Sequence, residues 1–239
     1  IRPTANTRMP YYTEAEWYPE SGRFACNLPG KAYVFFSEGS VISLHQVCVT
    51  YRHSDSWDGP VPRDDSAAFA PLLAELTARQ GGKALFYGDS ITTAANSSGM
   101  IGFEPYIPGW PKQVHDGIVE ATGNTAIEYV NTAVGGKNTQ WGLDNIQSRV
   151  IDYAPDFVLI AFGMNDGGKT REHYMDLTKQ IVDSMQENTG ADIILLATML
   201  PHWRAAGFFA HQIEYEPALS AYAAGMNNVA AAPMTSVHK

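Results

Sequence analysis

The alternation of apolar and polar positions predicts a regular α/β arrangement from Lys83 onwards. Short apolar runs predict strands at Ala84–Tyr87, Ala126–Val130, Phe157–Phe162, Ile193–Ala197 and Val229–Ala231. Between them, apolar residues recur at helical spacing over about Pro111–Ala121, Gln140–Asp152, Arg171–Glu187 and Glu216–Met226. Strands separated by helices of this length imply right-handed crossovers. The pattern therefore predicts a parallel sheet with helices on both faces.

The run Phe157–Phe162 is apolar without alternation, which is typical of a central strand buried on both faces. Upstream of the first strand, Ser66–Arg79 places apolar residues at helical spacing and predicts one more helix.

Residues 1–62 follow a different pattern. The short β-prone runs Ala32–Phe36 and Gln46–Tyr51 are separated by Gly, Pro, Ser and Asp. The stretch Asp58–Pro62 is typical of a linker, because its prolines block regular hydrogen bonding. We therefore interpret residues 1–62 as a β-rich N-terminal segment or partial accessory domain, and residues 63–239 as the α/β domain.

Composition and charge narrow the classes of partner. The formal net charge is −9, which argues against nucleic acid and anionic membranes, since both need a basic face. No apolar run reaches the roughly 20 residues that span a bilayer. Cys26 and Cys48 are the two cysteines, and they could form one bridge or remain two buried thiols. We favour an extracellular or cell-envelope location; the oligomeric state is not predicted.

Polar clusters follow three of the predicted strands. They are Tyr87–Ile91, Asn131–Gly136 and Gly163–Gly168. The carboxyl ends of parallel strands meet at one edge of a sheet, where ligands bind. We therefore expect the three clusters to lie together.

In the first cluster, Ser90 follows a Gly-Asp turn. Taken alone, such a serine is often a helix cap. The alternative is a nucleophile on a tight turn that Gly88 permits, with Asp89 in a structural role, accepting hydrogen bonds from nearby backbone N–H groups. The other two clusters favour this alternative.

Acyl transfer needs donors aimed at the oxyanion of the tetrahedral intermediate. An amide side chain at Asn165 and a backbone N–H at Gly136 are suitable donors. Singly, Gly135-Gly136 is equally typical of a strand-to-helix turn, and Asn165-Asp166 of a turn plus helix cap. Their coincidence with Ser90 at one sheet edge favours the chemical interpretation.

These three clusters resemble the first three signature blocks of the SGNH (GDSL-type) hydrolases. The resemblance implies that Ser90 is the nucleophile, and that Gly136 and Asn165 complete an oxyanion hole with the N–H of Ser90. It implies a flavodoxin-like three-layer α/β/α sandwich. We expect no cofactor and no metal. The preceding β-rich segment resembles accessory modules of carbohydrate-esterase members. We therefore expect a serine ester hydrolase acting on a small-molecule or carbohydrate ester, most readily an O-acylated carbohydrate.

One departure concerns the general base. The fourth signature of the family, Asp-x-x-His, does not occur in the 239 residues. We expect the domain to be truncated at its C-terminus, with the catalytic His and Asp beyond Lys239. The alternative is that His202 or His211 acts as the base.

Two other classes of function stay open: a binding module on a hydrolase scaffold without its base, and a nucleotide-binding flavodoxin-like protein. Metal-ligand and Walker-type spacings are absent from the sequence. Trp110, Trp141 and Trp203 are candidates either for packing or for stacking on a sugar.

Overall fold

The computed structural model describes residues 24–28, 31–35, 52, 54, 56, 66–79, 81–102, 104–201 and 210–237. The chain packs into two compact units. The first comprises Ile1–Trp57 and Ala95–Gly109, and the second comprises Asp58–Ala94 and Trp110–Lys239. The domain boundary at residue 62 stays a prediction.

In the first unit, β1 (Phe24–Leu28) and β2 (Lys31–Phe35) form an antiparallel pair in which Phe24 lies opposite Phe35. The strand β2 begins and ends one residue before the strand expected from the sequence. The expected strand Gln46–Tyr51 and linker Asp58–Pro62 lie outside the described residues.

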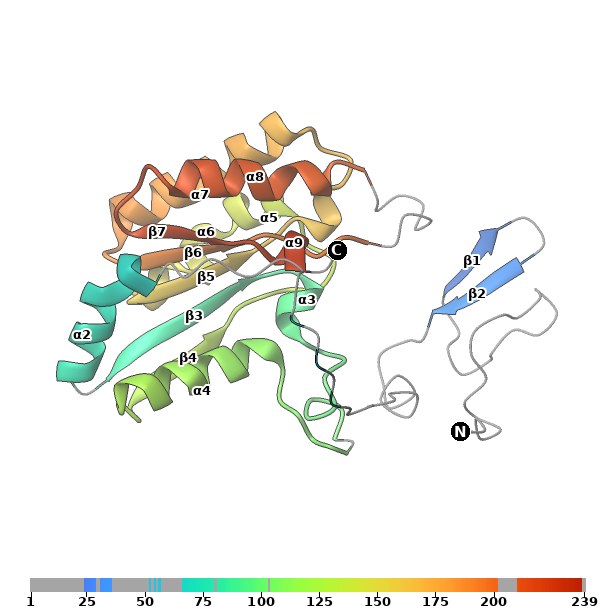
Figure 1. The fold of residues 1–239 in the computed structure, drawn as a ribbon. Coiled ribbons are helices and arrows are strands. Elements are labelled where there is room, and N and C mark those ends of the chain that lie inside the picture. Colours follow the sequence, from blue (N-terminus) through green and yellow to red (C-terminus); the bar gives the residue numbers. More distant parts are fainter. Residues whose placement is uncertain are drawn as a thin grey trace. The chain divides into compact units, whose positions relative to one another are not determined.

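The second unit is built on a five-stranded sheet in which every pairing is parallel (Figure 1). Its strands are β3 (Gly82–Gly88), β4 (Ile127–Asn131), β5 (Phe157–Ala161), β6 (Asp192–Leu196) and β7 (Val229–Ala232). Their order in the sheet is β4-β3-β5-β6-β7. All five strands predicted from the sequence are present, within two residues at each end.

Helices cover both faces of this sheet. They are η2 (Ser66–Phe69), α2 (Ala70–Ala78), α3 (Ser90–Thr93), α4 (Trp110–Thr122), α5 (Thr139–Asp144), α6 (Ile146–Arg149), η3 (Ile151–Tyr153), η4 (Met164–Asp166), α7 (Arg171–Asn188), α8 (Gln212–Ala223) and α9 (Met234–Val237). Figure 1 shows α5, α7 and α8 on one face, and α2 and α4 on the other. The predicted three-layer α/β/α architecture is therefore confirmed.

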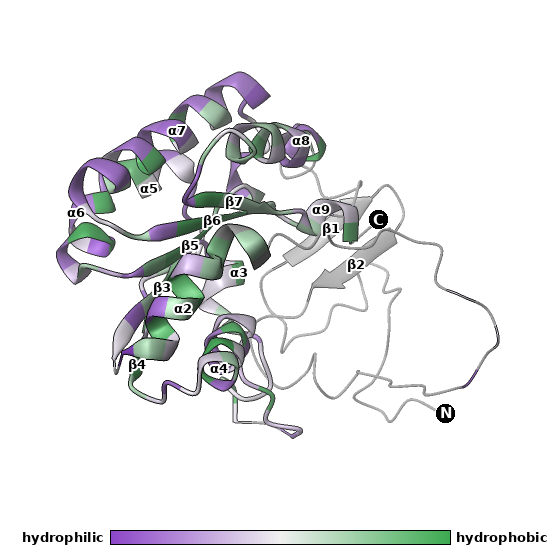
Figure 2. Cartoon of the chain, turned by 60° about the vertical axis from the view of Figure 1, so that its left-hand side comes forward, coloured by the Kyte–Doolittle hydropathy of each residue, from purple (hydrophilic) through white to green (hydrophobic). Residues whose placement is uncertain are grey.

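Each face of the sheet has its own apolar core. Under α7 and α8 the core includes Ile160, Ile181 and Ile193, and under α2 and α4 it includes Phe86 and Leu159. Every residue of β5 is buried, as expected of a central strand. Figure 2 shows the same division, with hydrophobic strands inside and hydrophilic outer surfaces on α7. The part of the chain that the structure describes contains no helix with the length and apolar character needed to traverse a bilayer.

Two predicted helices differ from the structure. The expected helix Gln140–Asp152 is broken into α5, α6 and η3. At the break, both the backbone N–H and the side-chain amide of Asn145 donate to Trp141 O, at 3.1 and 2.9 Å. This side chain competes with regular helix hydrogen bonding, as asparagine commonly does.

The expected helix Glu216–Met226 begins earlier, at Gln212, and ends at Ala223. Pro217 lies inside it rather than at its start. The earlier start is explained by tertiary packing, since Gln212 and Tyr215 in the first turn are fully buried.

Candidate active site

Ser90 is the first residue of α3, directly after β3, and it is exposed. Asp89 caps this helix, and its Oδ1 accepts a hydrogen bond of 2.9 Å from the backbone N–H of Ile91. The predicted structural role of Asp89 is thus confirmed. Gly88 permits the turn because a Cβ atom there would lie 2.4 Å from both Ala161 O and Thr92 Oγ1.

The loop after β4 runs beside the end of β3. The N–H of Thr132 donates to Phe86 O and that of Val134 to Gly88 O, each at 3.0 Å. A Cβ atom built on Gly135 would lie 3.7 Å from the Cβ of Ser90. The loop therefore reaches the serine one residue before Gly136, which has a positive φ of 75°.

Asn165 lies in η4, after β5, and its side chain joins the other two clusters. Its amide nitrogen donates to Lys137 O at 2.9 Å and lies 3.4 Å from Asp89 Oδ2. These partners are the residue after Gly136 and the residue before Ser90. The structure thus brings together the loops that carry all three site residues predicted from the sequence.

One interpretation of Asn165-Asp166 from the sequence was a turn plus a helix cap. In the structure, Asp166 does not cap the helix that follows it. Thr170 caps α7 instead, and Asp166 lies at the N-terminus of α5. Both of its carboxylate oxygens lie 3.1 Å from the backbone nitrogen of Thr139, and Lys169 Nζ lies 3.1 Å from Oδ1. This buried carboxylate therefore fixes the third cluster against the helix that follows the second.

The helix α8 also contacts the third cluster, through side chains that were not among the residues predicted for the site. Tyr215 Oη lies 2.6 Å from Asp166 O and 2.8 Å from Lys169 O. The side chain of Gln212 donates to Met164 O at 3.4 Å. No local pattern signals these contacts, because the partners lie more than 40 residues away along the chain.

The electrostatics of the site centre on Asp89, which is 1% exposed. Burial raises the pKa of the Asp89 carboxyl to about 6, and the negative charge of Asp166 acts in the same direction. Hydrogen bonds from the backbone N–H groups of Ile91 and Met164 oppose this rise. The carboxyl is therefore ionised at neutral pH and becomes protonated in mildly acidic solution.

Of the two histidines considered as alternative bases, His202 lies outside the described residues. The backbone N–H of His211 donates to Gly167 O at 3.3 Å, and its Nδ1 lies 3.0 Å from Glu214 Oε1. His211 thus borders the third cluster, but its role as a base stays a prediction.

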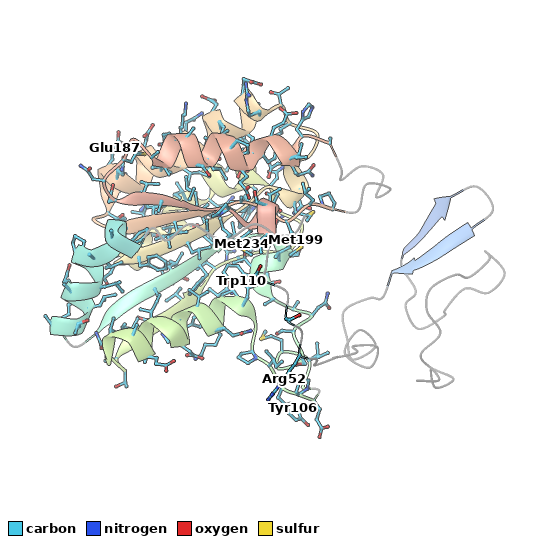
Figure 3. The ribbon with its side chains drawn as sticks, in the orientation of Figure 1. Arg52, Tyr106, Trp110, Glu187, Met199 and Met234 are labelled. Atoms are coloured by element: carbon cyan, nitrogen blue, oxygen red, sulfur yellow. The ribbon has the colours of Figure 1, made fainter. Side chains whose placement is uncertain are left out.

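Two of the three tryptophans lie near the clusters. Trp110 Nε1 donates to Ile91 O at 2.8 Å, and the side chain is labelled in Figure 3. Trp141 packs near Tyr87, with Lys137 Nζ 5.5 Å from its ring centroid. Trp203 lies outside the described residues. Trp110 thus has a packing and hydrogen-bonding role, and contact of any of the three with a sugar stays a prediction. Among the described residues, no group of three or more His, Cys, Asp or Glu side chains could hold a metal ion.

Comparison with solved structures identifies proteins of similar fold. A two-domain esterase, CEX, active on acetylated mannans aligns with a TM-score of 0.54 and 19% identity, over 71% of this chain and 41% of that one. This chain therefore spans less than half of CEX. A mutant of Axe2 from Geobacillus stearothermophilus, an acetyl-xylooligosaccharide esterase, aligns with a TM-score of 0.52 and 19% identity, over 66% of this chain and 78% of that one.

Curated proteins give no significant sequence match. Residues 86–238, which include all three clusters, match the GDSL-like lipase/acylhydrolase family over more than half of the chain. The chain belongs to this family of acyl-ester hydrolases.

Proposed function

We propose that this protein is a serine ester hydrolase acting on O-acylated carbohydrate. Ser90 attacks the ester carbonyl, and the oxyanion is bound by the N–H groups of Ser90 and Gly136 and the side-chain amide of Asn165. The alcohol leaves from the tetrahedral intermediate, and water then releases the acyl group from the serine.

The main support is the position of the Asn165 amide, which contacts the residue before Ser90 and the residue after Gly136. A side chain that contacts both loops in this way supports the proposal that its amide serves as a donor to a carbonyl oxygen at Ser90. Ser90 itself is exposed at the start of a helix, so an ester can approach its hydroxyl.

Activation of Ser90 requires a general base, which contributes roughly 10²–10⁴-fold to such reactions. The base in this proposal is the histidine of an Asp-x-x-His pair or, alternatively, His202 or His211. Support for a carbohydrate substrate comes from the similar folds of esterases that act on acetylated mannans and acetyl-xylooligosaccharides.

A fluorophosphonate probe tests the nucleophile. We expect it to label the wild type and not Ser90→Ala, while Ser148→Ala, an exposed serine on α6, is labelled normally. Labelling of Ser90→Ala at the wild-type rate would remove the assignment.

Acetate release tests the substrate separately. We expect release from acetylated xylo- or manno-oligosaccharides as well as from p-nitrophenyl acetate. If only p-nitrophenyl acetate were hydrolysed, the assignment of esterase activity would stand and the assignment of a carbohydrate substrate would be rejected.

A further inference from the structure

The Asn165 amide group is held between two acceptors. Its nitrogen faces the carbonyl oxygen of Lys137 at 2.9 Å and the carboxylate of Asp89 at 3.4 Å. If the amide were turned over, its own oxygen would face these two oxygens. The two neighbours therefore determine which end of the amide faces the site.

From this geometry, and resting on the proposed function, we propose that Asp89 is a positioning residue for the oxyanion hole. Its carboxylate holds the Asn165 side chain with the NH₂ group, and not the carbonyl oxygen, directed toward the acyl oxygen bound at Ser90.

Asp89 is itself well fixed for this role. Its Oδ1 accepts the 2.9 Å hydrogen bond from Ile91 N, and the backbone N–H of Met164 also donates to the carboxylate. Oδ2 lies 3.4 Å from the Asn165 amide nitrogen. Its backbone oxygen accepts from the N–H groups of Thr92 and Thr93 at the start of α3. The same side chain thus ties the turn that presents Ser90 to the orientation of Asn165.

The two hydrogen bonds of Asn165 differ in length, and this difference explains how the amide can still serve an oxyanion. The bond to Lys137 O has an ordinary length, whereas 3.4 Å to Asp89 Oδ2 is long. The hydrogen that faces Asp89 is therefore weakly bonded and can be shared between Asp89 Oδ2 and an oxyanion at Ser90 without turning the amide. The hydrogen bond to Lys137 O keeps the Asn165 side chain in the same position when an oxyanion is bound.

The substitution Asp89→Asn tests this role with little change of shape. Its side-chain oxygen can still accept from Ile91 N, but an NH₂ group then faces the NH₂ group of Asn165. We expect kcat to fall by about 10- to 100-fold with little change in KM, because the lost orientation matters in the transition state. The matched control is Asp156→Asn, at the opposite end of the sheet, where Asp156 accepts from Lys83 N; its kcat should equal that of the wild type.

A double-mutant cycle with Asn165→Ala distinguishes positioning from a general structural effect. If Asp89 acts through Asn165, adding Asp89→Asn to Asn165→Ala should lower kcat/KM no further. Wild-type kcat in Asp89→Asn, or independent and multiplicative losses in the double variant, would overturn the proposal.

A measurement that does not depend on turnover is the NMR titration of the Asn165 side-chain amide, assigned through its loss in Asn165→Ala. We expect its two proton signals to shift as pH passes through about 6 in the wild type and not in Asp89→Asn. Identical titration curves in the two proteins would reject the positioning role. A wild type without labelling or hydrolysis would instead reject the proposed function, and the titration would still decide the role of Asp89.

Discussion

The phenol oxygen of Tyr215 lies within hydrogen-bond distance of two backbone carbonyl oxygens, those of Asp166 and Lys169, at 2.6 and 2.8 Å. Its ring stacks on Tyr174 with 3.9 Å between the centroids. Asn165 precedes Asp166, so this one side chain connects α8 to the loop that supplies the proposed oxyanion donor.

We predict that Tyr215→Phe lowers the free energy of unfolding by about 1–3 kcal/mol. The phenylalanine keeps the stacked ring but removes the hydroxyl that faces Lys169 O, in a region where Tyr215 is fully buried. Asp166 O loses the same contact but keeps its hydrogen bond from the backbone N–H of Lys169. Urea denaturation measures the change. Tyr222→Phe on the same helix is the control, because that ring is partly exposed; equal losses in the two variants would contradict the prediction.

A second prediction concerns the turn before Ser90. Gly88→Ala places a Cβ atom 2.4 Å from Ala161 O, a backbone atom that can move only with β5. We expect a loss of about 1–3 kcal/mol in unfolding free energy from overpacking, together with reduced labelling of Ser90.

The control for Gly88→Ala is Gly117→Ala, inside α4, where a new Cβ atom meets nothing within 4 Å. Here alanine should stabilise the helix by up to about 1 kcal/mol. Effects of the same sign at the two glycines, measured by thermal unfolding, would show that the close approach at Gly88 does not determine the outcome.

The sheet could be predicted from the sequence because its strands are short apolar runs whose partners follow from the α/β alternation. The run Phe157–Phe162 lacks polar residues, and β5 is buried at every position. The loops that carry Ser90, Gly136 and Asn165 could be placed for the same reason, since parallel strands end at one edge.

What could not be predicted depends on contacts between distant segments. The break near Asn145 comes from a side chain that competes with the helix, and apolar periodicity does not register it. The hydrogen bond between Asn165 and Asp89 joins residues 76 positions apart. The sequence therefore predicted that Asp89 hydrogen-bonds its own turn, but it could not indicate the contact with Asn165 on which the proposed positioning role depends.

A third prediction follows from the pKa of Asp89, which burial raises from 3.8 to about 6. Between these two values the folded protein binds more protons at this site than the unfolded chain. The free energy of unfolding contributed by Asp89 is therefore greatest below about pH 4 and falls as pH rises through about 6. The change amounts to about 3 kcal/mol at most, from 1.36 kcal/mol per pKa unit.

Asp89→Asn should remove this pH dependence. We expect the stability of the variant, relative to the wild type, to increase as pH rises from about 4 to 7, as measured by urea unfolding at each pH. A constant difference over this range would show that the carboxyl titrates alike in the folded and unfolded states. Asp156→Asn, at the other end of the sheet, serves as the comparison.

The last prediction concerns packing on the α2 and α4 face of the sheet. An open cavity of about 210 Å³ lies there, bordered by Leu72 and Leu76 of α2, Val114 and Ile118 of α4, and Phe157 of β5. The atoms that face it are apolar, so added hydrocarbon meets hydrocarbon. We expect Val114→Leu to raise the free energy of unfolding by about 0.5–1 kcal/mol, since each buried methylene contributes about 0.8 kcal/mol.

The control for cavity filling is Val114→Ala, which separates packing from helix propensity. Alanine has the highest helix propensity but removes apolar atoms from the cavity wall, whereas leucine improves both. If the cavity determines the result, leucine should stabilise the protein and alanine should not. Urea denaturation measures the free energy of unfolding of both variants. If alanine raised it as much as leucine or more, the effect would come from helix propensity alone, and filling the cavity would not contribute to stability.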